Sequence, residues 1–143
     1  MTHIPTKSTV TTYILFDGTC HDAMKFYQSC LGGELSLTMV KDSPVKNEMP
    51  LHLHNRVLNA RLKGENLSIS ASDWLRPDQN PRPGNTMCLY VSSGTHAEVE
   101  EIFAKLSQGA DITDPLKKMF FGSYGALNDR FGVRWMFHAT AEP

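Results

Sequence analysis

Residues 12–33 read TYILFDGTCHDAMKFYQSCLGG, and this stretch carries the pattern that decides the fold. A short β-rich run over residues 12–16 is followed by an Asp-Gly turn and then by apolar residues at helical spacing. Thr19 with Asp22 three positions later resembles a capping box at the start of a helix. Gly32 is predicted to end the helix, because glycine readily adopts the left-handed conformation. The stretch therefore predicts a strand followed directly by a helix.

A second stretch repeats this order. Residues 86–109 read TMCLYVSSGTHAEVEEIFAKLSQG, with a strand-like run, a Ser-Ser-Gly turn and apolar residues at helical spacing. Thr95 and Glu98 match a full capping box, and Gly109 is predicted to end the second helix. Matched positions of the two stretches lie 74 to 77 residues apart, which indicates an internal duplication.

Three strand-like segments follow each helix, separated by turn residues and prolines. They are predicted at residues 35–40, 57–63, 67–72, 111–113, 124–128 and 133–138. Each half of the chain is therefore predicted to be a βαβββ module, which makes the fold class α+β. We expect the two modules to form a curved mixed sheet shaped as a cup, with both helices on its outer face. The 143 residues suffice for one domain, with half-repeats at 10–73 and 85–140 and a proline-containing linker at 74–84.

Composition and charge narrow the class of partners. The formal net charge of −1 forces no basic surface, so no nucleic-acid partner is expected. Cys20, Cys30 and Cys88 show neither CxxC nor zinc-like spacing, which indicates a reducing compartment. No apolar run reaches the roughly 20 residues that a membrane span needs, and residues 1–9 lack the apolar core of a signal peptide. We therefore expect a cytoplasmic protein without a membrane partner.

Side chains alternate between the two faces of each predicted strand. One face is apolar and is predicted to pack beneath the helices, with Tyr13 and Leu15 in the first strand, Met87 in the fifth, and Trp135 and Phe137 in the last. The opposite face is mixed, and either faces water or lines the cup. Its guanidinium groups favour a carboxylate or phosphate ligand. The residues predicted to contact a ligand there are Asn59, Arg61, Tyr90, Arg134 and His138.

Several motifs resemble those of the vicinal oxygen chelate superfamily, which is built from paired βαβββ modules and includes glyoxalase I, extradiol dioxygenases and the fosfomycin and bleomycin resistance proteins. Within it, the chain is most similar to the PhnB-like branch, some members of which carry an older label as demethylubiquinone methyltransferases. The resemblance implies the cup fold and a homodimer. The matching stretches span nearly the whole chain and are YILFDGTC (13–20), AMKFY (23–27), LGG (31–33), PL (115–116), FFG (120–122) and DRFGVRWM (129–136).

The resemblance also implies where metal ligands would lie. In metal-using members, His, Glu or Gln side chains point into the cup from the first and last strands of each half. The corresponding positions here are Thr12, Ser68, Thr86 and Met136, and none of these side chains is a competent ligand for a divalent transition metal. The branch often has a His in its third strand, where this chain has Asn59. We therefore expect a degenerate metal site, with no metal and no other cofactor.

The sequence thus predicts a protein that binds a small, anionic organic molecule in its cup, and whether it catalyses a reaction is left open. The alternatives are a metal-dependent lyase or dioxygenase of glyoxalase type, and a resistance-type protein that sequesters a drug. His52 and His54 form a weaker candidate metal pair, and Cys88 with His138 a weaker nucleophile–base pair. His96 is expected to be solvated. No phosphate-binding loop, nucleophile elbow or S-adenosylmethionine motif supports the methyltransferase label.

Overall fold

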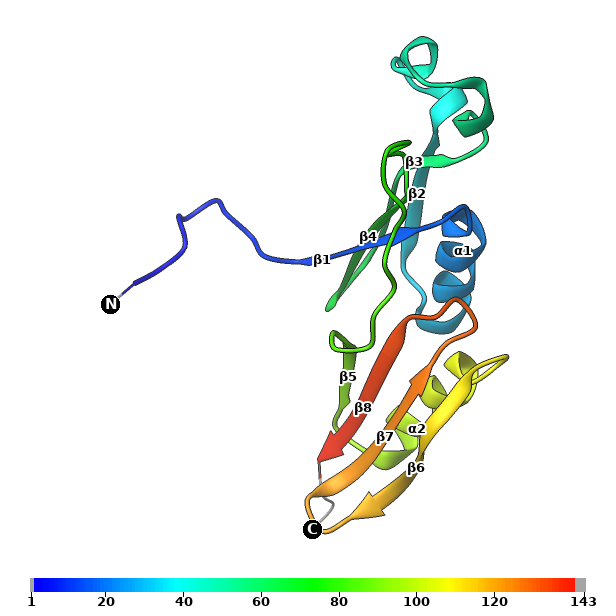
Figure 1. Ribbon diagram of the computed structural model, residues 1–143. Helices are drawn as coiled ribbons and strands as arrows, with labels where there is room; N and C mark the ends of the chain where they lie inside the picture. The colour runs from blue at the N-terminus through cyan, green and yellow to red at the C-terminus, as the bar shows by residue number, and fades with distance from the viewer. Residues whose placement is uncertain (1, 141–143) are drawn as a thin grey trace. The chain divides into compact units, whose positions relative to one another are not determined.

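The computed structural model describes residues 2–140, and the chain divides into two compact units, residues 1–81 and 82–143 (Figure 1). Each unit contains a four-stranded mixed sheet and one helix that packs against it. The predicted α+β class with two βαβββ modules is therefore confirmed. No helix in the described part of the chain is long and apolar enough to cross a membrane.

The first unit has the strand order β1-β4-β3-β2. β1 pairs in parallel with β4, and the other neighbours are antiparallel. Its elements are β1 (Thr12–Phe16), α1 (Cys20–Leu31), β2 (Glu34–Met39), three 3₁₀ turns at Val40–Asp42, Lys46–Glu48 and Leu51–Leu53, β3 (Val57–Gly64) and β4 (Leu67–Asp73).

The second unit repeats this topology with the strand order β5-β8-β7-β6, and β5 is parallel to β8. Its elements are β5 (Leu89–Ser93), α2 (His96–Leu106), β6 (Asp111–Met119), β7 (Gly122–Asn128) and β8 (Arg134–Thr140). β6 is much longer than the predicted segment 111–113 and includes Pro115. An edge strand tolerates a proline because its outer N–H groups need no partner, and the register shifts on both sides of Asp114.

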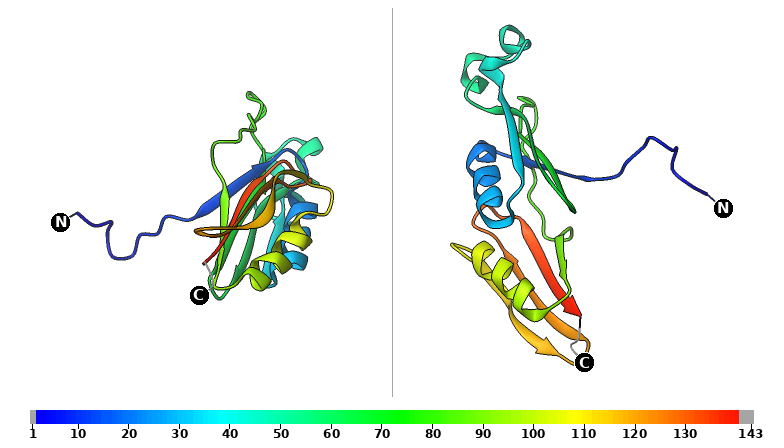
Figure 2. Two further views of the ribbon diagram at one scale, coloured as in Figure 1. Left: turned by 90° about the horizontal axis from the view of Figure 1, so that it is seen from below. Right: turned by 180° about the vertical axis from the view of Figure 1, so that it is seen from behind.

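Each helix covers a single face of its own sheet (Figure 2). In the first unit, the buried side chains of α1, including Met24 and Tyr27, pack over buried residues of β3 and β4 such as Leu62 and Ile69. In the second unit, the ring of Phe103 meets the ring of Phe137 edge-on at 4.9 Å. We call the sheet face away from the helix the open face.

Gly125 lies beneath α2, at a position that has no room for a side chain. A Cβ atom there would lie 3.0 Å from the Phe103 ring and 3.1 Å from the Leu116 backbone. The glycine lets the aromatic residue of the helix approach the sheet closely, which is one reason for glycine inside a strand.

The predicted faces are wrong for β1. Thr12 pairs with Ile69, a buried residue of the helix-covered face, so Thr12 shares that face. Tyr13 and Leu15 consequently point to the open face, where each is 51% exposed. The pattern misleads because four consecutive residues of this strand are apolar, so alternation cannot tell the faces apart. The predicted burial of Met87 beneath the helix is also wrong, since Met87 precedes β5 and is exposed.

The predicted cap of α1 is wrong as well, and a distant carboxylate replaces it. Thr19 makes no side-chain capping bond. Asp73, 2% exposed at the end of β4, accepts hydrogen bonds at Oδ1 from the N–H groups of Gly18 (2.9 Å) and Cys20 (3.0 Å). Its Oδ2 accepts from the N–H of Val57 at 2.8 Å. One side chain thus joins the start of α1, the β1–α1 turn and the start of β3.

The cap of α2 follows the prediction. The Thr95 hydroxyl accepts a hydrogen bond from the N–H of Glu98 at 3.2 Å and donates one to the Glu98 carboxylate at 2.9 Å. A local motif therefore begins the second helix, whereas a tertiary contact begins the first.

We expect Asp73→Asn to lower the free energy of unfolding by about 3 kcal/mol, because an amide turns a donor toward one of the three N–H groups that the carboxylate accepts from. Urea unfolding followed by circular dichroism measures the loss. Asp78→Asn is the matched control, since Asp78 is exposed and its pair with Arg76 spans 3.7 Å. The control should change stability by less than about 0.5 kcal/mol, and equal effects of the two substitutions would contradict the role of Asp73.

Candidate functional site

A row of polar side chains crosses the open face of the first sheet. The register places Tyr13 beside Ser70, Ser70 beside Arg61, and Arg61 beside Ser36. The row therefore contains a phenol, two hydroxyls and a guanidinium, one from each strand. Arg61 is exposed and makes no salt bridge with any residue of the described chain. The row offers hydrogen-bond donors and one positive charge that lacks an ionic partner.

The second sheet carries a row at the corresponding strands. Ser92 lies beside His138, His138 beside Tyr124, and Tyr124 beside Lys117. Two further aromatic rings stack near the imidazole of His138. Tyr90 and Phe121 each have their ring centroid 6.5 Å from it, at interplanar angles of 21° and 15°. This open face therefore combines an aromatic cluster with a lysine at one edge.

The remaining predicted contact residues are Arg134 and Asn59. Arg134 is already engaged, since it donates to Thr113 Oγ1 at 3.2 Å and to Asn128 Oδ1 at 3.4 Å. Its Nη2 lies 3.8 Å from a carboxylate oxygen of Asp114. Asn59 lies on the open face of the first sheet, opposite Thr38. Of the two arginines, Arg61 is thus the one that makes no salt bridge within residues 2–140.

The side chains on the open faces do not suit a divalent metal. Thr12 lies on the helix-covered face of β1 and Thr86 precedes β5, while Ser68 and Met136 lie on the open faces. The open faces of β1, β4, β5 and β8 carry one histidine, His138, and no carboxylate. Across residues 2–140, no group of three or more His, Cys, Asp or Glu residues could hold an ion. The donor set therefore does not fit the metal that the superfamily resemblance implies.

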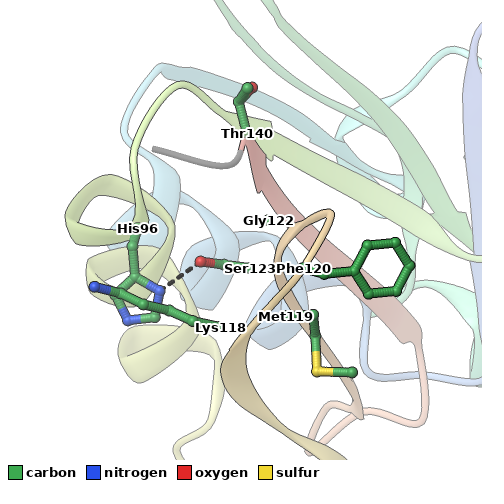
Figure 3. A pocket seen from close by; sticks show the side chains of 7 residues that line it. All are labelled: His96, Lys118, Met119, Phe120, Gly122, Ser123 and Thr140. Carbon is green, nitrogen blue, oxygen red and sulfur yellow. Dashed lines mark hydrogen bonds between the residues drawn. The ribbon is translucent and has the colours of Figure 1, made fainter. Parts of the chain in front are cut away.

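A pocket of about 290 Å³ lies where the β6–β7 hairpin meets the first turn of α2 (Figure 3). His96 Nδ1 lies 2.6 Å from Ser123 Oγ, and His96 Nε2 lies 2.9 Å from Glu100 Oε2. His96 is therefore held between two partners, and the expectation that it is solvated is wrong. The i,i+4 spacing of His96 and Glu100 is a weak sequence signal for their ion pair. The sequence gives no signal for the contact with Ser123, which lies 27 residues from His96. The pocket is lined by His96, Lys118, Met119, Phe120, Gly122, Ser123 and Thr140.

All three cysteines are free thiols. Burial, reinforced by the nearby Asp73 carboxylate, raises the pKa of Cys20 from its ordinary value of 9.0 to about 12. A thiol that stays protonated is a poor nucleophile. Cys20 is therefore a packing residue at the start of α1.

The family model described as 3-demethylubiquinone-9 3-methyltransferase matches residues 8–137 of the chain. The chain belongs to this family. Its solved relatives include a Bacillus cereus protein described as a putative 3-demethylubiquinone-9 3-methyltransferase, PhnB protein. The predicted resemblance to the PhnB-like branch is therefore confirmed.

The similarity to three other proteins extends over nearly the whole chain. The Bacillus cereus structure is 26% identical and covers 93% of this chain and 100% of its own, with a TM-score of 0.72. Protein PA1353 from Pseudomonas aeruginosa is 28% identical over 95% of this chain and 100% of its own, with a TM-score of 0.84. Protein YjdN from Escherichia coli (strain K12) is 27% identical over 91% of this chain and 94% of its own.

More distant structures share the fold of this PhnB-like protein. Two proteins described as glyoxalase/bleomycin resistance protein/dioxygenase, from Nocardioides and Frankia, are 16% and 18% identical, with TM-scores of 0.59 and 0.61. The chain therefore shares its fold with proteins that carry this description.

The raised pKa of Cys20 predicts a fall in stability at alkaline pH. The unfolded thiol ionises near 9.0 and the folded thiol only near 12, so the folded state retains the proton across this range. The free energy of unfolding therefore decreases as pH rises through this range. Urea unfolding at about pH 8 and about pH 10.5 should show a smaller decrease for Cys20→Ala than for the parent protein. An identical decrease in both would contradict the assignment.

Proposed function

We propose that the protein binds a small organic anion on the open face of its first sheet, with Arg61 as the charged contact. The observation that carries this proposal is the row Tyr13–Ser70–Arg61–Ser36, whose guanidinium is exposed and has no salt bridge within residues 2–140. Guanidinium groups bind carboxylates and phosphates through two parallel hydrogen bonds. The neighbouring hydroxyls can donate to the remaining oxygens of such a group.

The choice of Arg61 over Arg134 rests on electrostatics. Arg134 has Asp114 within 3.8 Å and two oxygen acceptors, so an incoming anion would compete with partners that are already in place. An anion near Arg61 faces no such competition. Asn59, two residues from Arg61 on the same face of β3, supplies a further amide contact in the proposal.

The open face of the second sheet is proposed to hold planar organic groups. Tyr90, His138 and Phe121 provide near-parallel ring planes, and stacking on such planes favours flat, unsaturated ligands. Lys117 lies in the same row as His138 and gives this face its own cation. Arg134 is held by Thr113, Asn128 and Asp114, and in the proposal it contacts a ligand while it keeps these partners.

The proposal uses neither metal nor methyl-group chemistry. The open faces of β1, β4, β5 and β8 lack carboxylates, and the sequence contains no S-adenosylmethionine motif that would support the family's methyltransferase description. The three free cysteines suit a reducing compartment such as the cytoplasm. A homodimer is implied by the superfamily resemblance and stays a prediction.

A thermal-shift screen with small carboxylates, phosphates and phosphonates tests the proposal. A ligand present at about 100 times its Kd should stabilise the protein by about 2.7 kcal/mol. For any compound that raises the melting temperature, titration calorimetry should show that Arg61→Gln weakens binding by at least about tenfold, since a hydrogen bond to a charged group is worth about 1.5–3 kcal/mol. Arg76→Gln is the matched control, because Arg76 is an exposed arginine outside the sheets.

Dialysis against EDTA should leave the melting temperature and the ligand response unchanged. Equal binding by the parent protein and Arg61→Gln would contradict the assigned contact. About one tightly bound divalent ion per chain in freshly purified protein, with loss of ligand binding on its removal, would instead favour the metal-dependent lyase or dioxygenase.

A further inference from the structure

We infer that the pocket at the start of α2 is a nucleophilic site, in which Ser123 attacks small carboxylic esters with His96 as the base and Glu100 as the group that orients it. The inference starts from a continuous chain of contacts. Ser123 Oγ lies 2.6 Å from His96 Nδ1 (Figure 3). His96 Nε2 lies 2.9 Å from Glu100 Oε2. A hydroxyl, an imidazole and a carboxylate in this order are the three roles of a serine nucleophile site.

The two contacts of His96 determine which nitrogen carries the proton. A carboxylate is an acceptor only, so Glu100 holds the proton of a neutral imidazole on Nε2. Nδ1 is then the unprotonated nitrogen, and it faces the Ser123 hydroxyl as an acceptor. This is the tautomer that removes a proton from serine, with the two ring nitrogens in exchanged roles relative to the familiar triad.

The fold holds this chain from two elements. His96 and Glu100 are one helical turn apart on α2, which places their side chains on the same face of the helix. Ser123 lies on β7, beside Ala139 on the helix-covered face, and is 3% exposed. Packing of α2 against β7 and β8 therefore sets the distance between base and hydroxyl.

The pocket distinguishes this arrangement from a hydrogen bond that only joins helix and sheet. Both Ser123 and His96 line a cavity of about 290 Å³, so a small molecule in the cavity would lie beside the pair. Lys118, which pairs with Ser123 across the β6–β7 hairpin, lines the same cavity and supplies a positive charge for a developing oxyanion. Met119 and Phe120, the latter 93% exposed, also line the cavity and add apolar surface to it.

The proposed step is the hydrolysis of an ester in two stages. Ser123 Oγ bonds to the acyl carbon while its proton passes to His96 Nδ1, and the proton then goes to the departing alkoxide or phenoxide as the ester C–O bond breaks. Water repeats the sequence, giving its proton to His96, releasing the carboxylic acid and returning the proton to Ser123. The size of the cavity, at the lower end for small-molecule sites, favours short acyl groups with good leaving groups. None of the steps uses the open-face residues, so the inference is independent of the proposed anion binding.

The test combines a covalent probe with a small substrate on the full chain. A fluorophosphonate should modify the parent protein on Ser123, with loss of fluoride, as seen by intact mass and peptide mapping. p-Nitrophenyl acetate should be hydrolysed with turnover. Ser123→Ala should abolish both, and His96→Gln should slow labelling by about a hundredfold, as expected for removal of a general base. Melting temperatures measured in parallel identify any variant that fails to fold.

Glu100→Gln keeps the test decisive if a pocket substitution unfolds the protein, because Glu100 is 66% exposed. It should slow labelling by about tenfold at neutral pH. Glu101→Gln is its matched control, since Glu101 makes an equivalent i,i+4 pair with Lys105 at 3.4 Å on the same helix, away from the pocket. The control should label at the rate of the parent protein. No adduct on Ser123 in folded protein, an adduct on Lys118 instead, or equal labelling of Glu100→Gln and Glu101→Gln would overturn the inference.

Discussion

The first unit depends on a single buried carboxylate. Asp73 accepts hydrogen bonds from the N–H groups of Gly18, Cys20 and Val57, which belong to three different segments. A buried charge is tolerated only when hydrogen bonds replace its hydration, and here the protein supplies three of them. The same charge helps to keep the thiol of Cys20 protonated. The start of the helix, the entry of β3 and the end of β4 are therefore held in one arrangement.

That arrangement decides which side chains reach the open face. Once β1 pairs with β4 so that Thr12 lies beside Ile69, Tyr13 must lie beside Ser70 and share its face. The row that ends in Tyr13 also contains Arg61, the exposed guanidinium without a salt bridge in the described chain. A slip of one residue would exchange the two faces of the strand. The chemistry of the open face is thus a consequence of strand register.

The two faces of the second sheet carry different chemistry. On the open face, His138 stacks with aromatic rings and lies in a row with Lys117. On the helix-covered face, His96 lies between Ser123 and Glu100 beside a pocket. The second sheet thus presents an aromatic cluster on one face and a serine–histidine–glutamate chain of contacts on the other. Fold alone does not determine which of these a protein uses.

The sequence by itself determined the order of the elements, the two modules and the cap formed by Thr95 and Glu98, because these depend on contacts within a few residues. It also identified Arg61 and His138 as open-face residues, since Asn59, Arg61 and Lys63 alternate with apolar residues in one strand and Arg134 and His138 flank Trp135 and Phe137 in the other. Only the tertiary structure decided the faces of β1, the cap of α1 by Asp73 and the contact of His96 with Ser123. In each of these contacts the two residues are far apart in the sequence, by 57, 53 and 27 positions respectively. Local patterns cannot report them, because the pairing partner that sets each one comes from a distant strand.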